Sequence, residues 1–400
     1  MGTDVLDTSD LIGAHPPARK GGRFASWSPL LARVVLTALL VVVIASMIVP
    51  TNKPGNRSPW LGPVEGPVDA GGKAVDTPEK PYDEDIALYE VAIERIATGE
   101  NYYDFIVPEQ RGRDYPVNPG IAVRLPTLAY IDAWLGKTGQ LVAAIALMLA
   151  IIAKWWQRLG EETEDGGRLR RLGTALVFVG ASLGLNRHYF PLHELWAGGL
   201  IALSFGLHRI GHRGQGGRWV AAFAVAALAL AIREHTLPYV LLMAAFALWQ
   251  RNWRESAAWI ALILMFFAAL TWHLEIIARD VLASDRHGPP WLVMRGMTGW
   301  LANVVQSSNL RWLPHFLAGP AVILMTFGWL GWRSRSGLFG FLLCAGYGAA
   351  FMIAGRWDNF YWGAVIAPAM FAGIVFAPRA VSQLVAAARL PGLSRLQPAN

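Results

Sequence analysis

The sequence contains very little cysteine and very little charge for its length. Its single cysteine, Cys344, lies inside an apolar run, which excludes a disulfide framework and a thiolate metal site. Only 16% of the 400 residues are charged, whereas 54% are hydrophobic. The sequence contains no glycine-rich phosphate-binding loop between a predicted strand and a predicted helix. These absences argue against a soluble domain and are typical of a chain that lies mostly in lipid.

The chain is nevertheless basic, with a formal net charge of +7 and a pI near 9.7. Its Lys and Arg residues are scattered through short loops between apolar stretches and are not interleaved with aromatic residues on one face. This distribution argues against nucleic acid as a partner. It is better explained as a signal for the orientation of membrane-spanning helices.

Apolar stretches of spanning or near-spanning length predict about ten transmembrane helices, and therefore an all-α, polytopic membrane protein. They lie at residues 30–50, 139–157, 172–187, 191–207, 219–232, 236–250, 257–275, 313–332, 338–354 and 360–377. The intervening stretch 119–136 is ambiguous, because counting it as a span would place the Arg-rich loop 154–172 outside. We therefore expect 119–136 to lie along the membrane interface.

The basic residues give these spans a direction. With the N-terminus inside, the short inner loops carry Lys154, Arg158, Arg168, Arg170, Arg171, Arg209, Arg213, Arg218, Arg251, Arg254, Arg333 and Arg335. The short outer turns carry only Arg187, Arg233 and Arg356. The positive-inside rule then predicts that both termini lie in the cytoplasm. We expect the membrane to be a bacterial inner (plasma) membrane, with the active site on its periplasmic (outer) face.

This topology divides the chain into a cytoplasmic N-terminal tail (1–29), a transmembrane domain (30–377) and a cytoplasmic C-terminal tail (378–400). Two large segments, 51–138 and 276–312, are expected outside the membrane. The start of the first, residues 51–80, is rich in Pro, Gly and charge and is expected to be irregular.

A helix is predicted where the first outer segment regains apolar periodicity. From Asp83, residues Ile86, Tyr89, Ile93 and Ile96 recur at helical spacing and form one apolar face. Asp83, Glu84 and Asp85 then occupy the first turn. Carboxylates there can cap free backbone N–H groups and match the helix dipole, and capping is the favoured explanation on spacing alone. The alternative is that one of them is a catalytic base.

The order of elements in this region resembles the first outer loop of the GT-C superfamily of glycosyltransferases. The resemblance covers residues 30–157 and rests on a first span followed by Asp85, Tyr89, Gly99, Tyr103 and Tyr115-Pro116. It is most similar to the small members that use polyprenyl-phosphate sugars and resemble mannosyltransferases. The chain departs from the pattern at one position: the superfamily motif is Tyr-Pro-Pro, whereas Val117 follows Tyr115-Pro116 here.

The resemblance implies a fold and a chemistry. Asp85 matches the acidic residue that activates the acceptor hydroxyl in that superfamily, with Asp83 and Glu84 as the next candidates. Tyr89 and Tyr103 match the motif as substrate-binding residues. The implied reaction is an inverting transfer from a polyprenyl-phosphate sugar to a glycan, lipid or protein acceptor at the outer face, in glycan or glycolipid assembly.

Independently of any family, ionisable and aromatic residues gather at the predicted outer ends of the spans. They are Arg187, His188, His193, Glu194, Arg233, Glu234, His235, Arg356, Asp358 and Tyr361. Such side chains are costly in lipid and tend to face a wet cavity, which predicts a site for a phosphate-bearing donor.

Arg233 is the first candidate for a phosphate clamp, because its guanidinium offers paired donors at membrane depth. For Arg233 the alternative is snorkelling to head groups or pairing with Glu234. Arg356 and Arg187 are further candidates for the clamp, and for Arg356 the alternative is a local ion pair with Asp358.

No firm cofactor is predicted. His188, His193, Glu194 and His235 could in principle hold a divalent metal, but their spacing fits no strong metal motif, so interfacial hydrogen bonding is favoured.

Two other functions fit part of the pattern. A surface-polysaccharide polymerase or ligase would place its key residues in a late outer loop, where Arg286, His287 and Arg295 lie. A transporter or flippase for a lipid-linked substrate would use the same charges as a path, but it should carry them in the middle of its spans.

Overall fold

The computed structural model describes residues 22–51, 83–162, 166–210 and 219–389. Within these ranges every regular element is a helix, and the only extended pairing is an isolated bridge between Asn118 and His287. The prediction of an all-α protein is therefore confirmed. The expectations for residues 52–80 and for most of the N-terminal tail concern parts of the chain outside the described residues.

The α-helices in chain order are α1 (Pro29–Ile48), α2 (Asp83–Ala97), α3 (Tyr102–Gly112), α4 (Thr127–Glu162), α5 (Gly166–Ala181), α6 (His193–Leu207), α7 (Val220–Ile232), α8 (Leu237–Trp249), α9 (Trp253–Asp280), α10 (Gly296–Gln306), α11 (His315–Gly328), α12 (Arg335–Ile353), α13 (Ala367–Met370) and α14 (Ala377–Ala388). Short 3₁₀ helices join several of them: η2 (Gly120–Ala122), η3 (Ser182–Leu185), η4 (Arg187–Tyr189), η5 (Glu234–Thr236), η6 (Asn309–Trp312), η7 (Trp329–Gly331), η8 (Trp357–Val365) and η9 (Phe371–Phe376).

Five helical stretches in the described ranges are long and apolar enough to cross a membrane. They are Pro29–Ile48, Gly120–Glu161, Trp253–Asp280, Arg335–Ile353 and Ala367–Ala388. Two shorter apolar stretches, Val220–Ile232 and His315–Gly331, coincide with further expected spans. A helical membrane protein is thus supported by length and composition, whereas a total of ten spans stays a prediction.

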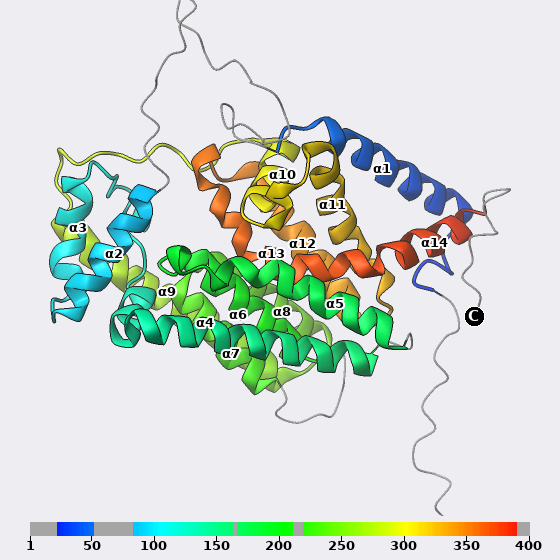
Figure 1. The fold of residues 1–400 in the computed structure, drawn as a ribbon, viewed down its shortest axis with the longest axis horizontal. Helices are drawn as coiled ribbons and strands as arrows, with labels where there is room; N and C mark the ends of the chain where they lie inside the picture. Colours follow the sequence, from blue (N-terminus) through cyan, green and yellow to red (C-terminus); the bar gives the residue numbers. More distant parts are fainter. Residues whose placement is uncertain (1–21, 52–82, 163–165, 211–218, 390–400) are drawn as a thin grey trace, which may run out of the picture.

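The helices form an elongated bundle with α2 and α3 at one end (Figure 1). α4 packs against α5 and α6, α6 packs against α7, and α8 packs against α9. α1 lies at the other side of the bundle, against α11 and α14. The main core includes Trp155, Phe205, Trp329 and Phe339, whereas apolar side chains such as Leu30 on α1 remain exposed, as expected of a surface that faces lipid.

Two predicted boundaries differ from the structure. The interfacial segment 119–136 and the span 139–157 are joined in α4, which changes direction at Gly136, where φ is +61° and ψ is 174°. Glycine is the residue that adopts this conformation without steric cost. The last expected span, 360–377, is built from η8, α13 and η9, and helix continues through α14 to Ala388. The expected tail therefore begins inside a helix.

α2 forms where the apolar spacing predicts it. Ile86, Leu88 and Ala92 are buried, and Tyr89 and Ile93 are partly buried beside them. This face packs against α3 and the first leg of α4 and makes a small separate core at that end of the bundle. α2 is therefore held by protein contacts, and its expected position on a membrane surface stays a prediction.

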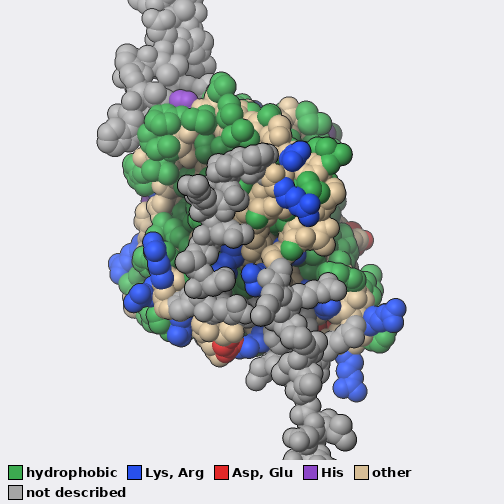
Figure 2. All heavy atoms as spheres, turned by 90° about the vertical axis from the view of Figure 1, so that its right-hand side faces the viewer, with side chains coloured by type: hydrophobic (Ala, Val, Ile, Leu, Met, Phe, Trp, Pro, Cys, Tyr) green, Lys and Arg blue, Asp and Glu red, His purple; other side chains and the backbone are tan. Residues whose placement is uncertain are grey.

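Basic side chains gather at the opposite end of the molecule. Figure 2 shows Lys and Arg side chains spread over the face at which α4 ends and α5 begins, with few acidic side chains among them. The bundle thus has a basic end and, at the other end, the α2–α3 layer. The orientation of these two ends across a membrane stays a prediction.

α6 comes unusually close to η8, and a glycine makes this possible. A Cβ on Gly198 would lie 2.2 Å from the carbonyl oxygen of Ala364, which is far inside van der Waals contact. Glu194 precedes Gly198 by one helical turn, and Tyr361 precedes Ala364 by three residues. The close contact therefore fixes the distance between two elements that carry predicted site residues.

We expect Gly198→Ala to lower the free energy of unfolding by about 1–3 kcal/mol, because the added methyl group must push α6 away from η8. The measurement is the thermal midpoint of the purified protein in detergent. Gly346→Ala is the matched control: Gly346 lies in α12 with open space around it, so alanine should raise stability by up to about 1 kcal/mol. Equal effects of the two substitutions would contradict the close approach.

Candidate functional site

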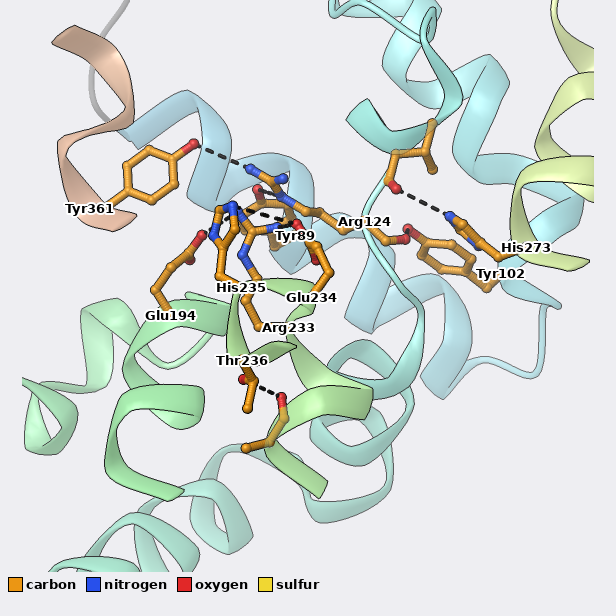
Figure 3. A network of polar contacts seen from close by, with 12 residues as sticks. Tyr89, Tyr102, Arg124, Glu194, Arg233, Glu234, His235, Thr236, His273 and Tyr361 are labelled. Carbon is orange, nitrogen blue, oxygen red and sulfur yellow. Dashed lines mark hydrogen bonds and ion pairs between the residues drawn. The ribbon is translucent and has the colours of Figure 1, made fainter. Parts of the chain in front are cut away.

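Predicted site residues from α2, α6, η8 and the turn between α7 and α8 meet in one polar cluster (Figure 3). Glu194 lies in the first turn of α6, and Arg233 and Glu234 lie in the tight turn between α7 and α8. We call these three residues the Arg–Glu cluster. His235 lies beside it, and Tyr89 from α2 and Tyr361 from η8 lie above it in Figure 3. The ring of His193 packs against that of Tyr89, with the ring centroids 5.1 Å apart.

Arg233 is the centre of the Arg–Glu cluster. Its side chain is completely buried, and Nη2 lies 2.7 Å from Oε1 of Glu194 while Nη1 donates to Glu234. The backbone explains this position: Arg233 ends α7 with an extended conformation, and the Thr236 hydroxyl donates to the Ala229 carbonyl at 3.0 Å, which closes the turn. The predicted pairing with Glu234 is thus present, with a second carboxylate that the sequence spacing did not indicate.

Burial and nearby charge determine the protonation states of Glu234 and His235, in the turn that follows α7. Burial raises the pKa of the Glu234 carboxyl, but the positive charge of Arg233, with Arg124 beyond it, outweighs this effect and holds that pKa at about 2. Burial also lowers the pKa of the His235 imidazole well below its usual value, and the nearby charge of Arg233 lowers it further. Glu234 is therefore ionised and His235 neutral at pH 7.

Arg124 is a site residue that the sequence analysis missed. It lies between η2 and α4, inside the ambiguous stretch 119–136. Its Nε donates to the Tyr89 hydroxyl at 3.1 Å, and its Nη2 donates to the Tyr361 hydroxyl at 3.3 Å. Within the described ranges of the chain Arg124 has no ion pair with a carboxylate, in contrast to Arg233. It is the cation of this region best placed to receive an anion.

Asp85 lies one helical turn before Tyr89 and is partly exposed. Burial raises the pKa of the Tyr89 hydroxyl, the charge of Arg124 opposes this rise, and the negative charges of Asp85 and Glu194 add to it. The charge of Asp85 therefore acts on the hydroxyl that accepts a hydrogen bond from Arg124. No residue in the described part of the chain forms an ion pair with its carboxylate.

Other predicted residues lie outside the cluster. Arg187 and His188 are exposed in η4, and Tyr103 turns toward α9, where its hydroxyl lies 3.1 Å from Nδ1 of His273. Asp83 and Glu84 begin α2, but their side chains lie outside the described residues. The substrate-binding roles of these residues stay predictions.

Arg356 and Asp358 form the local ion pair that their spacing suggested, with Nη2 of Arg356 2.7 Å from the carboxylate. In the late outer loop Arg286 pairs with Asp114 at 2.6 Å. Arg295 donates to the Arg356 carbonyl at 2.9 Å and lies over the Trp357 ring. The late loop is thus bound to neighbouring segments through its basic residues.

The described residues contain no group of three or more His, Cys, Asp or Glu side chains that could hold a metal ion. The side chains described above supply electrostatic and acid–base groups. Arg124 presents a guanidinium, and the two tyrosine hydroxyls that accept its N–H groups keep their own O–H donors. With Asp85 nearby, the site combines donors for an oxyanion with a carboxylate that can accept a proton.

Comparison of the chain with protein-family models, with curated proteins and with solved structures gives no match. The resemblance to the GT-C superfamily consequently rests on the residues quoted for it and stays a hypothesis.

The neutral, buried state of His235 has a consequence for stability. In the unfolded chain this imidazole takes up a proton below pH about 6.5, whereas in the folded protein it does not. Stability should therefore fall as the pH is lowered from 7 to 5, with His235 contributing up to about 1.4 kcal/mol per pH unit. We expect His235→Gln to make the dependence of the thermal midpoint on pH shallower. An unchanged slope would show that other groups carry it.

Proposed function

We propose that the chain is an integral-membrane glycosyltransferase of the GT-C type. It moves a sugar from a polyprenyl-phosphate donor to an acceptor hydroxyl at the outer membrane face. One observation carries the proposal: Arg124, a cation without an ion pair to a carboxylate in the described ranges, donates to the hydroxyls of Tyr89 and Tyr361. The negative charge of Asp85, one helical turn before Tyr89, acts on both hydroxyls. The helix α2, which carries Asp85 and Tyr89, lies at the end of the bundle opposite the basic face (Figures 1 and 2).

In this reaction Asp85 accepts the proton of the acceptor hydroxyl as its oxygen attacks the anomeric carbon. The bond between that carbon and the phosphate oxygen breaks, and the polyprenyl phosphate leaves with the bonding electron pair. Arg124 and the O–H groups of Tyr89 and Tyr361 stabilise the negative charge of the departing phosphate. A single displacement of this kind inverts the anomeric carbon.

The two arginines have different tasks in the proposal. Arg233 was the first candidate for the phosphate clamp, but its guanidinium is completely buried between Glu194 and Glu234. Its charge is already compensated, and no part of its side chain is exposed. Arg233 therefore holds the turn in place, whereas the partly exposed Arg124 binds the phosphate.

We expect Asp85→Asn to reduce sugar transfer by about 10²–10⁴-fold, because the amide cannot accept the proton. The measurement is transfer of radiolabelled sugar from a panel of polyprenyl-phosphate sugars into lipid and glycan fractions of membranes that contain the variant. Glu90→Gln is the matched control, since it makes the same chemical change at an exposed position of α2. Equal product from Asp85→Asn and the parent protein would remove Asp85 from the chemistry and leave it as a helix cap.

We expect Arg124→Gln to reduce transfer by about 10²–10³-fold, because it removes the charge that stabilises the leaving phosphate. Arg124→Lys should recover only part of the rate, since an ammonium lacks the planar paired donors that reach both tyrosines. Arg279→Gln, exposed near the end of α9, is the control. If Arg124→Gln retained the parent rate, the phosphate would have to bind elsewhere.

A further inference from the structure

A small cavity lies beneath the candidate site, between α2, α3 and the first leg of α4. Its volume is about 20 Å³, and its walls are mostly apolar. Tyr89 and Arg124 of the candidate site line it, together with Gln110 from α3 and Asp132 from α4. The cavity therefore adjoins the guanidinium to which we assign the donor phosphate.

Two polar side chains in the cavity wall have oxygens without hydrogen-bond partners. Asp132 is 0% exposed, and neither of its carboxyl oxygens has a partner. Gln110 is 5% exposed, and its amide oxygen also has none. A buried polar atom left unpaired is costly, and native proteins contain few of them. Three such oxygens in the wall of one cavity indicate a ligand that supplies the missing hydrogen bonds.

The cavity limits what this ligand can be. A volume of about 20 Å³ holds a single water or one hydroxyl group. Three oxygens are fewer than a hard cation takes, and Arg124 lines the same cavity, which disfavours a positive charge. The carboxyl group of Asp132 disfavours an anion. A neutral O–H group fits, because it can donate to a carboxylate or accept from a carboxylic acid.

We propose that Asp132 and Gln110 form a subsite that binds one hydroxyl group of the sugar carried by the lipid phosphate, and so select the sugar that is transferred. This inference rests on the proposed function, in which Arg124 holds the phosphate. The sugar is attached directly to that phosphate, so one of its hydroxyls is the first O–H group presented to the cavity. A buried water molecule is the other group that can supply the missing hydrogen bonds to Asp132 and Gln110.

The test measures binding and not transfer, so that it is independent of catalysis. The purified protein in detergent is titrated with a polyprenyl-phosphate sugar, with the same lipid lacking one sugar hydroxyl at a time, and with bare polyprenyl phosphate. We expect the parent protein to bind the complete sugar lipid more tightly than bare lipid. Loss of one particular hydroxyl should remove about 10- to 100-fold of this affinity.

The decisive variant is Asp132→Leu, which has a similar volume and removes a buried polar group. It should bind bare lipid phosphate as the parent does, lose the preference for that one hydroxyl, and keep or raise its thermal midpoint. Gln110→Leu should weaken the same preference. Glu94→Gln, exposed on α2, is the control.

The outcomes separate the two proposals. If Asp132→Leu keeps the parent's preference among sugar lipids, or if the parent has none, the subsite is overturned. Loss of stability with the preference intact would identify a structural water in its place. If the preference exists and depends on Asp132 but no donor supports transfer, the subsite stands and the transferase proposal fails.

Discussion

The structure of the site depends on the burial of one positive charge, that of Arg233. A guanidinium without solvent is tolerated only when its charge is compensated, and Glu194 and Glu234 provide that compensation from both sides. The pairing joins the start of α6 to the turn between α7 and α8. It also uses up both carboxylates of the Arg–Glu cluster. The hydrogen bonds of Arg124 in the described ranges therefore go to hydroxyl groups, and the proposed function depends on this difference between the two arginines.

Much of this site could be predicted from the sequence, because the cost of ionisable groups in lipid limits where they can go. Glu194, Arg233, Glu234 and Tyr361 come from three separate stretches of the chain, yet each stands at an expected outer end of a span. Ends of predicted spans on one side of a membrane are expected to lie at one level. The periodicity around Tyr89 likewise predicted α2, since an apolar face at helical spacing needs a partner surface.

The residues that the sequence analysis missed were missed for one common reason. Arg124 and Asp132 belong to the stretch 119–136, whose hydropathy fits neither a full span nor a soluble loop. Their environment depends on the change of direction at Gly136, which brings the first leg of α4 beneath α2 and α3. Hydropathy carries no information about such a bend. The sequence also did not show that Arg233 pairs with carboxylates and Arg124 with hydroxyls. The partners of Arg124 come from α2 and η8, which lie on either side of it in the sequence.

The hydrogen bond between Arg124 and Tyr361 also has a consequence for biosynthesis, because it joins residues 237 positions apart. At translation rates of about 5–20 residues per second, roughly 10–50 s pass between the synthesis of the arginine and that of its second tyrosine. Throughout that interval the early helices can insert and pack, but the pair of hydroxyls around the guanidinium is incomplete. The site is assembled only when nearly the whole chain has been made, so a truncated or stalled product inserts without it.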